Sequence, residues 1–168
     1  MRRLLLLRHA KSSWSDATAR DHDRPLNARG RRAAPLVGDY LRREDLVPDR
    51  VLCSSARRTC ETLALLDLPD TTDGVIEHDL YLAHPETVLE AVRGTVASVT
   101  SLMVIGHNPT MHELALDLAH GGDVAARAAL GRGYPTAALA ALGVTGDWAG
   151  LESAAAVLDR FVTPRDLE

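Results

Sequence analysis

Apolar runs and apolar stripes alternate along most of the chain. A short run of Leu, Val or Ile between charged or turn residues is typical of a buried strand, whereas apolar residues three and four positions apart are typical of one face of a helix. The runs predict strands over residues 3–8, 50–53, 74–77 and 101–106. The stripes predict helices over residues 29–43, 85–99 and 109–119, and a further helix that ends near Leu66.

Polar residues mark where two of these helices begin. Ser54 or Ser55 is expected to cap the helix that ends near Leu66, because a serine hydroxyl can accept a hydrogen bond from a free backbone N–H. Asn108 is expected to cap the helix that follows the strand at residues 101–106, with Pro109 at its first position.

Two further apolar segments, residues 136–144 and 154–162, predict a pair of strands joined by a turn at Thr145-Gly146-Asp147. Strand and helix alternate before this pair, which is the order expected of an α/β protein. We therefore predict a three-layer α/β sandwich, in which helices cover both faces of a mostly parallel central sheet. With 168 residues, the chain is expected to form a single domain, residues 1–168.

Composition and charge limit the classes of function. Hydrophobic residues make up 46% of the chain and charged residues 25%, which excludes a disordered protein. The formal net charge is −4, so the chain lacks the excess of cations that drives general nucleic-acid binding. The apolar run Leu4–Leu7 is too short for a signal peptide or a membrane span, and Cys53 and Cys60 form no metal motif. We expect a cytoplasmic protein that binds neither nucleic acid nor membrane.

Charged and polar residues follow three of the predicted strands at the point where each strand ends. Arg8-His9 follows the first strand, residues 54–58 follow the second, and Gly106-His107-Asn108 follows the fourth. In a parallel sheet such strand ends meet at one edge, where ligands bind. Arg suits phosphate because its planar group donates two hydrogen bonds at once, and neighbouring Arg residues should lower the pKa of His9 and keep it a neutral nucleophile. The pattern predicts a cationic pocket for a phosphate monoester.

Four segments of the chain resemble the histidine phosphatase (phosphoglycerate mutase-like) superfamily. Residues 5–10, Leu-Leu-Leu-Arg-His-Ala, resemble its Arg-His-Gly signature, with Ala in place of Gly. Residues 54–62 are similar to its Ser-Pro-Leu-x-Arg-Ala-x-Gln-Thr segment, and residues 104–109 resemble the segment that carries its second histidine. Residues 23–30 match a stretch between the first strand and the first helix. The resemblance covers nearly the whole chain and implies the phosphoglycerate mutase-like fold.

The resemblance also implies roles for individual residues. His9 would attack phosphorus and become a phosphohistidine, which water then hydrolyses. Arg8, Arg58 and His107 would hold the phosphoryl oxygens, and the register of the match selects Arg58 rather than Arg57. No metal and no other cofactor is implied.

Three more residues are candidates for substrate binding. Ser15 stands six residues after His9, where relatives with an Asn hydrogen-bond the phosphate. Asn108 follows the second histidine, and His22 is expected at the rim of the pocket together with its neighbours Asp21 and Asp23. The substrate would be a phosphorylated small molecule or a phosphoprotein, and the sequence leaves open whether the protein is a monomer or a homodimer.

One departure from the family bears on the substrate. Members that act on phosphate esters carry a Glu general acid after the third strand, and residues 79–86 of this chain have no acid at the matching place. Glu86, Glu77 or Asp79 is available as a substitute, or the enzyme works without an acid. A phosphoramidate leaves more easily than an alkoxide, so the gap resembles the small bacterial branch that acts on phosphohistidine in signalling proteins.

Alternative functions remain open at this level. A phosphomonoesterase of the same family for a sugar phosphate, a glycerate phosphate or a nucleotide would use the same pocket, and a non-catalytic module that binds phosphoproteins would keep it without turnover.

Two other chemistries do not fit the sequence. A cysteine phosphatase needs Cys-x₅-Arg, which would put an Arg at Thr59 when counted from Cys53, and no His-Glu-x-x-His metal motif occurs.

Overall fold

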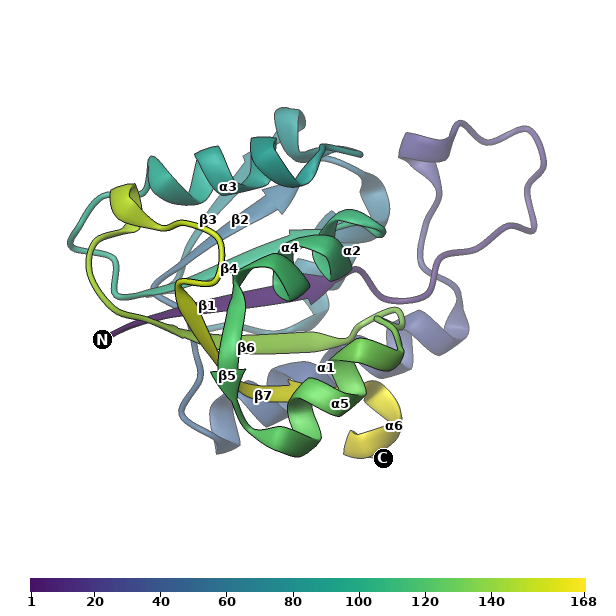
Figure 1. The fold of residues 1–168 in the computed structure, drawn as a ribbon. Coiled ribbons are helices and arrows are strands. Elements are labelled where there is room, and N and C mark those ends of the chain that lie inside the picture. The colour runs from purple at the N-terminus through teal and green to yellow at the C-terminus, as the bar shows by residue number, and fades with distance from the viewer.

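The consecutive leucines of the first strand, β1 (Arg2–Arg8), are fully buried on both sides of that strand. Leu4 and Leu6 belong to one hydrophobic core, and Leu5 and Leu7 belong to another. Successive side chains of a strand point to opposite faces, so both faces of the sheet must be covered where β1 lies. In a computed structural model that describes residues 1–168, β1 lies in the interior of a seven-stranded sheet (Figure 1).

The elements follow the predicted alternation of strand and helix. The strands are β1, β2 (Arg50–Ser54), β3 (Asp73–Glu77), β4 (Ser101–Gly106), β5 (Ala119–Gly122), β6 (Leu139–Val144) and β7 (Ala156–Val162). The helices are α1 (Ala28–Arg43), α2 (Arg57–Leu65), α3 (Pro85–Arg93), α4 (Thr110–Leu118), α5 (Val124–Arg132) and α6 (Pro164–Leu167). No helix is both long enough and apolar enough to span a membrane.

The sheet is mostly parallel, as predicted. Its strand order is β3-β2-β4-β1-β6-β7-β5. The four strands from β3 to β1 run parallel to one another, β6 is antiparallel to both of its neighbours, and β5 pairs in parallel with β7. The carboxyl ends of β1, β2, β3 and β4 therefore lie at the same edge of the sheet.

Helices cover both faces, so the predicted three-layer sandwich is confirmed. Helices α3, α4 and α5 pack over the core that contains Leu4 and Leu6. Helix α1, the C-terminal end of α2 and the short α6 pack over the core that contains Leu5 and Leu7 (Figure 1). The two cores are separated by the sheet and are built from alternate residues of the same strands.

The prediction of a helix over residues 85–99 was wrong at its C-terminal end. Helix α3 ends at Arg93, and Gly94 follows it as the C-cap with its backbone N–H bonded to Glu90. Val96 is exposed, while Val99 is buried although it lies outside the helix. The regular valine spacing continued past the helix because a loop residue also supplies apolar surface to the core.

The predicted helix caps also need correction. The N-cap of α2 is Ala56, whose own side chain makes no hydrogen bond. The Ser54 hydroxyl accepts from the Ala56 backbone N–H at 3.3 Å and also bonds to the His107 ring, and the Ser55 hydroxyl bonds to the His22 ring. The N-cap of α4 is Pro109 rather than Asn108, although Asn108 Oδ1 still accepts a hydrogen bond from the backbone of the third helical residue at 3.3 Å. Strand β5 and helix α5 were not predicted, since their small residues give little periodic signal.

Candidate active site

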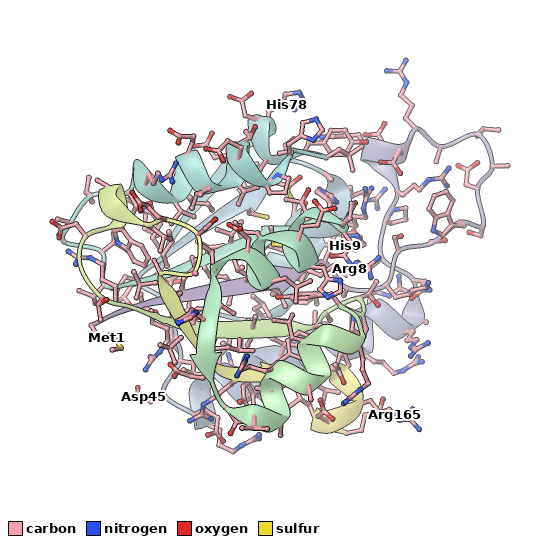
Figure 2. The ribbon with its side chains drawn as sticks, in the orientation of Figure 1. Met1, Arg8, His9, Asp45, His78 and Arg165 are labelled. Carbon is pink, nitrogen blue, oxygen red and sulfur yellow. The ribbon has the colours of Figure 1, made fainter.

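The register of the parallel strands brings three chain segments to one place. Arg8 of β1 pairs with Gly106 of β4, and Cys53 of β2 pairs with Ile105 of β4. The residues that follow these strands therefore emerge side by side, and the backbone N–H of His9 donates to the Gly106 carbonyl at 3.1 Å. Figure 2 shows Arg8 and His9 at the end of β1, on the opposite side of the molecule from Met1.

His9 and His107 form the centre of the candidate site. Their ring centroids lie 5.4 Å apart, and the two residues are only 7% and 4% exposed. Nδ1 of His9 lies 2.7 Å from the Ala10 carbonyl oxygen. A carbonyl can only accept a hydrogen bond, so Nδ1 carries the proton and the lone pair of a neutral ring is on Nε2. The backbone thus fixes which nitrogen of His9 can act as a nucleophile.

The protonation of His107 is fixed in the same way by its two partners. Nη2 of Arg58 lies 3.3 Å from Nδ1 of His107, and the Ser54 hydroxyl lies 2.8 Å from Nε2. A guanidinium can only donate, so Nδ1 accepts from Arg58 and the Nε2–H donates to Ser54. His107 is therefore neutral here, with its proton on the nitrogen farther from Arg58.

Burial keeps both rings uncharged at neutral pH. It lowers the pKa of His9 to about 4, and the positive charges of Arg58 and Arg8 act in the same direction. Burial likewise lowers the pKa of His107 to about 3, assisted by the neighbouring His9 and by Arg58. An ordinary histidine has a pKa of about 6.5, so both rings stay neutral well below the pH at which a free imidazole is protonated.

Arg58 is anchored by Asp21, which lies in a single 3₁₀ turn before α1. Its Nη1 donates to the Asp21 carbonyl at 2.8 Å, and its Nη2 donates to the Asp21 carboxylate at 3.0 Å. The Tyr81 hydroxyl donates to the same carboxylate oxygen. Burial alone would raise the pKa of Asp21, but the hydrogen bonds from Tyr81 and Arg58 and the charge of Arg58 outweigh it and lower the pKa. Asp21 is therefore an anion that orients the guanidinium.

Arg8 is held on the other side by the segment before β6. Its Nη1 donates to the Tyr134 carbonyl at 2.9 Å, and the Asn108 amide donates to the same oxygen at 3.0 Å. Nε of Arg8 is buried and has no hydrogen-bond partner. Burial and the nearby charge of Arg58 lower the pKa of Arg8. The two arginines thus approach the histidine pair from different anchors, and Arg8 retains an unused donor.

The structure brings most, but not all, of the predicted site residues together. His22 lies beside the central group: its Nε2 is 2.9 Å from the Ser55 hydroxyl, and its ring meets Tyr81 edge-on with centroids 4.7 Å apart. Ser15 is different, because it is exposed on the loop between β1 and α1 that stands away from the sheet (Figure 1), and its hydroxyl pairs with Ser13.

Two site residues, Ser54 and Tyr81, were missed from the sequence, and Asp21 was expected only at the rim of the pocket. Ser54 was assigned to a helix cap, because serine is one of the preferred residues at that position. Tyr81 follows β3, whose carboxyl end lies at the same edge of the sheet as those of β1, β2 and β4. The convergence of strand ends that selected His9 and His107 could therefore also have selected Tyr81. The pairing of Asp21 with Arg58 had no local signal, because only the folded loop brings the two residues together.

None of the expected substitutes for the general acid contacts this group. Glu86 pairs with Arg93 at 3.3 Å on the outer side of α3. Glu77 and Asp79 line a separate cavity of about 470 Å³ between β2, β3 and α3. Asp21 is the carboxylate that contacts the group, and its lowered pKa makes it a poor proton donor.

The remaining candidate chemistries find little support in the arrangement of side chains. Burial raises the pKa of the Cys53 thiol well above its ordinary value, so it is not a nucleophile at neutral pH. No three His, Cys, Asp or Glu side chains are grouped so as to hold a metal ion. The candidate site provides a neutral imidazole, that of His9, near the guanidinium groups of Arg8 and Arg58. The lone pair of this imidazole can accept a phosphoryl group.

Comparisons with known proteins agree with this chemistry. The model of the histidine phosphatase superfamily (branch 1) matches residues 4–81. The protein Rv1276c of Mycobacterium tuberculosis is 43% identical over 161 residues, which is 95% of this chain and 100% of that protein. Two solved structures assigned as the phosphohistidine phosphatase SixA are also similar. The one from Nakamurella multipartitia has a TM-score of 0.86 at 32% identity, covering 97% of this chain and 96% of its own.

The second SixA structure, from Agrobacterium tumefaciens, has a TM-score of 0.80 at 33% identity and covers 97% of this chain and 98% of its own. The similarity extends over both helical layers and the whole sheet, not only over the segments that carry the histidines. With relatives above 30% identity along almost its full length, the chain belongs to the histidine phosphatase superfamily and is a phosphatase.

Proposed function

We propose that this phosphatase removes the phosphoryl group from phosphohistidine in proteins of the cytoplasm, through a covalent intermediate on His9 and without a metal ion. The observation that carries the proposal is the fixed tautomer of His9. Its Nδ1–H is bonded to the Ala10 carbonyl, so the nucleophilic lone pair on Nε2 is available in a buried, cationic environment.

In the first step, Nε2 of His9 attacks phosphorus while the bond from phosphorus to the substrate nitrogen breaks. The bonding electrons leave with the substrate imidazole, which departs neutral if its other nitrogen is protonated. The phosphorylated His9 ring still carries its Nδ1 proton and is therefore positively charged, and the Ala10 carbonyl stabilises that proton. In the second step, water attacks phosphorus, the electron pair returns to Nε2 and inorganic phosphate is released.

Arg8 and Arg58 would stabilise the charge that develops on the phosphoryl oxygens. Both ring nitrogens of His107 are engaged in this structure, by Arg58 and by Ser54, so His107 would assist only by giving its Nε2–H to a phosphoryl oxygen in place of Ser54. Arg58 is oriented by Asp21, so its position does not depend on the substrate. Donors held in place before the reaction stabilise a transition state without the free-energy cost of reorganisation.

The surroundings of the site favour phosphohistidine over a phosphate ester. An alkoxide leaving group needs a proton from a general acid, and Asp21, the carboxylate at the site, is held in its charged form. A protonated imidazole has a pKa of about 6.5, so imidazole is a far weaker base than an alkoxide and can leave without a proton from a general acid. The solved relatives from Nakamurella multipartitia and Agrobacterium tumefaciens are likewise assigned as phosphohistidine phosphatases.

The choice of substrate can be tested with two peptides of one sequence, one carrying phosphohistidine and the other phosphoserine. We expect kcat/KM to be about 10²–10⁴ higher for the phosphohistidine peptide, which is the range that a missing general acid forfeits on an ester. Excess chelator should leave the rate unchanged, and His9→Ala should abolish turnover. Equal rates on both peptides would instead favour a small-molecule phosphomonoesterase, and binding without turnover would favour a phosphoprotein-binding module.

The two adjacent arginines of α2 provide a matched pair of variants. Arg58 contacts His107 and Asp21, whereas Arg57 points outward and pairs with Glu61 at 3.3 Å. Arg58→Ala should lower kcat/KM by about 10²–10³, the usual effect of removing one preorganised donor. Arg57→Ala should change it less than twofold. The reverse order of effects would show that the wrong arginine has been assigned.

The charge state of the nucleophile can be followed by NMR titration of the histidine rings in the substrate-free protein. Burial and the two arginines lower the pKa of His9 to about 4, so its resonance should stay constant from pH 7.5 to pH 5 and shift only below that range. An unperturbed imidazole would be about nine-tenths protonated at pH 5.5 and could not attack. A midpoint near pH 6.5 for His9, identified by its loss in His9→Asn, would contradict this mechanism.

A further inference from the structure

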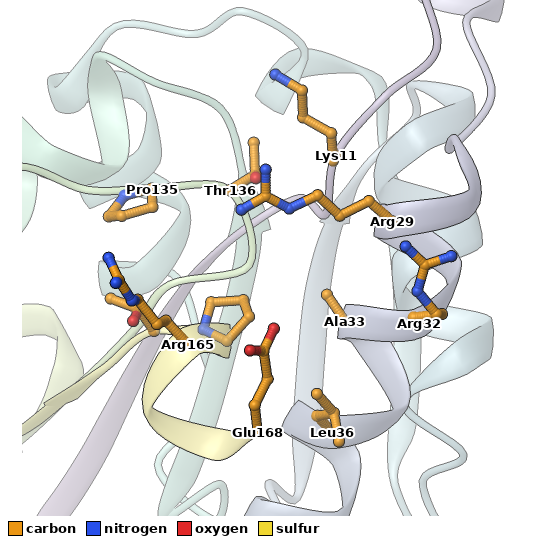
Figure 3. A pocket seen from close by; sticks show the side chains of 11 residues that line it. Lys11, Arg29, Arg32, Ala33, Leu36, Pro135, Thr136, Arg165 and Glu168 are labelled. Carbon is orange, nitrogen blue, oxygen red and sulfur yellow. The ribbon is translucent and has the colours of Figure 1, made fainter.

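A cavity of about 550 Å³ lies beside the proposed catalytic group and belongs to none of the roles assigned so far. Its walls come from four parts of the chain: the segment after His9, the first turns of α1, the segment before β6, and the C-terminal segment with α6. Figure 3 shows Arg29 and Arg32 on the side of α1 and Arg165 on the side of α6, with the hollow between them.

Two chain segments join the cavity to the catalytic site. Lys11, which lines it, is two residues beyond His9, and its carbonyl accepts the backbone N–H of Asn27 at 2.9 Å. Helix α1 can approach this backbone only because residue 30 is glycine, since a Cβ there would overlap the Lys11 carbonyl oxygen. On the other side, Pro135 and Thr136 line the cavity directly after Tyr134, the residue whose carbonyl holds Arg8.

The cations that line the cavity are free. Lys11, Arg29, Arg32 and Arg165 form no ion pair and donate no side-chain hydrogen bond. Most other arginines of the chain do, for example Arg50 with Asp73 at 2.8 Å. Glu168 is the one acidic residue of the lining, and it forms no ion pair with them. In a protein of net charge −4, four free cations around one hollow make a local positive field next to the site.

The spacing of these four cations suits several carboxylates on a protein surface better than it suits one small anion. All four cations are exposed and come from separate turns and segments, whereas a phosphate site needs donors that converge on one point. Between them lie apolar groups, including Ala33, Leu36 and Pro135. Exposed cations around a partly apolar hollow are typical of the rim of a protein interface, where they steer and orient an oppositely charged partner.

We propose that this cavity binds acidic residues of the substrate protein that flank its phosphohistidine. The inference rests on the proposed function, because it concerns how that substrate is recognised. Lys11 follows His9 closely in the chain, and Pro135 and Thr136 follow Tyr134. These short connections place the acidic segment next to the phosphoryl group, so the enzyme selects phosphohistidine within an acidic surface.

The test uses two phosphohistidine dodecapeptides, one with Glu and one with Gln at the flanking positions. For the unmodified enzyme, kcat/KM should be about tenfold higher for the Glu peptide, and the ratio should fall toward one as salt is raised. The double variant Arg29→Gln/Arg32→Gln should lose the preference. The charge-matched control Arg43→Gln/Arg127→Gln changes exposed arginines outside the cavity and should keep it. The ratio of two substrates is unaffected by a partial loss of folded enzyme.

A binding measurement separates this inference from the proposed function. A fluorescent, unphosphorylated Glu peptide should bind more tightly than the Gln peptide, and Arg29→Gln/Arg32→Gln should remove the difference. If neither phosphohistidine peptide is hydrolysed but this binding preference holds, the proposed substrate is wrong and the acidic site stands. Equal kcat/KM for the two peptides, or binding of tripolyphosphate without any preference for the Glu peptide, would overturn the acidic site and leave the proposed function intact.

Discussion

The site depends on one constraint: two imidazole rings are buried away from water, next to two guanidinium groups. Burial makes a proton on either ring unfavourable, and the charges of Arg8 and Arg58 add to that effect, so His9 and His107 are neutral. Because both rings are neutral, a single set of hydrogen bonds can fix their tautomers, and the Ala10 carbonyl leaves Nε2 of His9 as the free base. A proton on Nε2 of His9 would be costly beside these cations, whereas the negative charge of a phosphoryl group on Nε2 would offset the charge of the ring and attract both arginines.

The sheet supplies the geometry and the loops supply the anchors. Parallel pairing of β1 with β4 fixes His9 next to His107 before any loop is considered. The two arginines are then held from opposite sides, Arg58 by the Asp21 carboxylate and Arg8 by a carbonyl of the segment that leads into the antiparallel strand β6. The nucleophile is therefore positioned by rigid strands. The surrounding loops, which include walls of the cavity lined by Lys11, Arg29, Arg32 and Arg165, can then distinguish one substrate from another.

The sequence was sufficient to predict the layers and the core of the site. Runs of buried residues such as those of β1 carry a strong periodic signal, and strand ends in a parallel sheet converge by rule, so His9 and His107 could be predicted to meet. Contacts that depend on loop conformation could not. The pairing of Asp21 with Arg58 joins residues that are far apart in sequence, and the Ser54 hydroxyl bonds to His107 as well as to the backbone N–H of Ala56 at the start of the helix. The basic cavity likewise forms only when α6 folds against α1.

The most direct measurement is to quench the reaction during turnover of a ³²P-labelled phosphohistidine peptide and to locate the label on the enzyme by proteolysis and mass spectrometry. We expect an acid-labile, alkali-stable phosphoryl group on His9, present in the unmodified protein and absent from His9→Ala. Label on Cys53 or on a serine, or turnover with no labelled enzyme at any quench time, would contradict it.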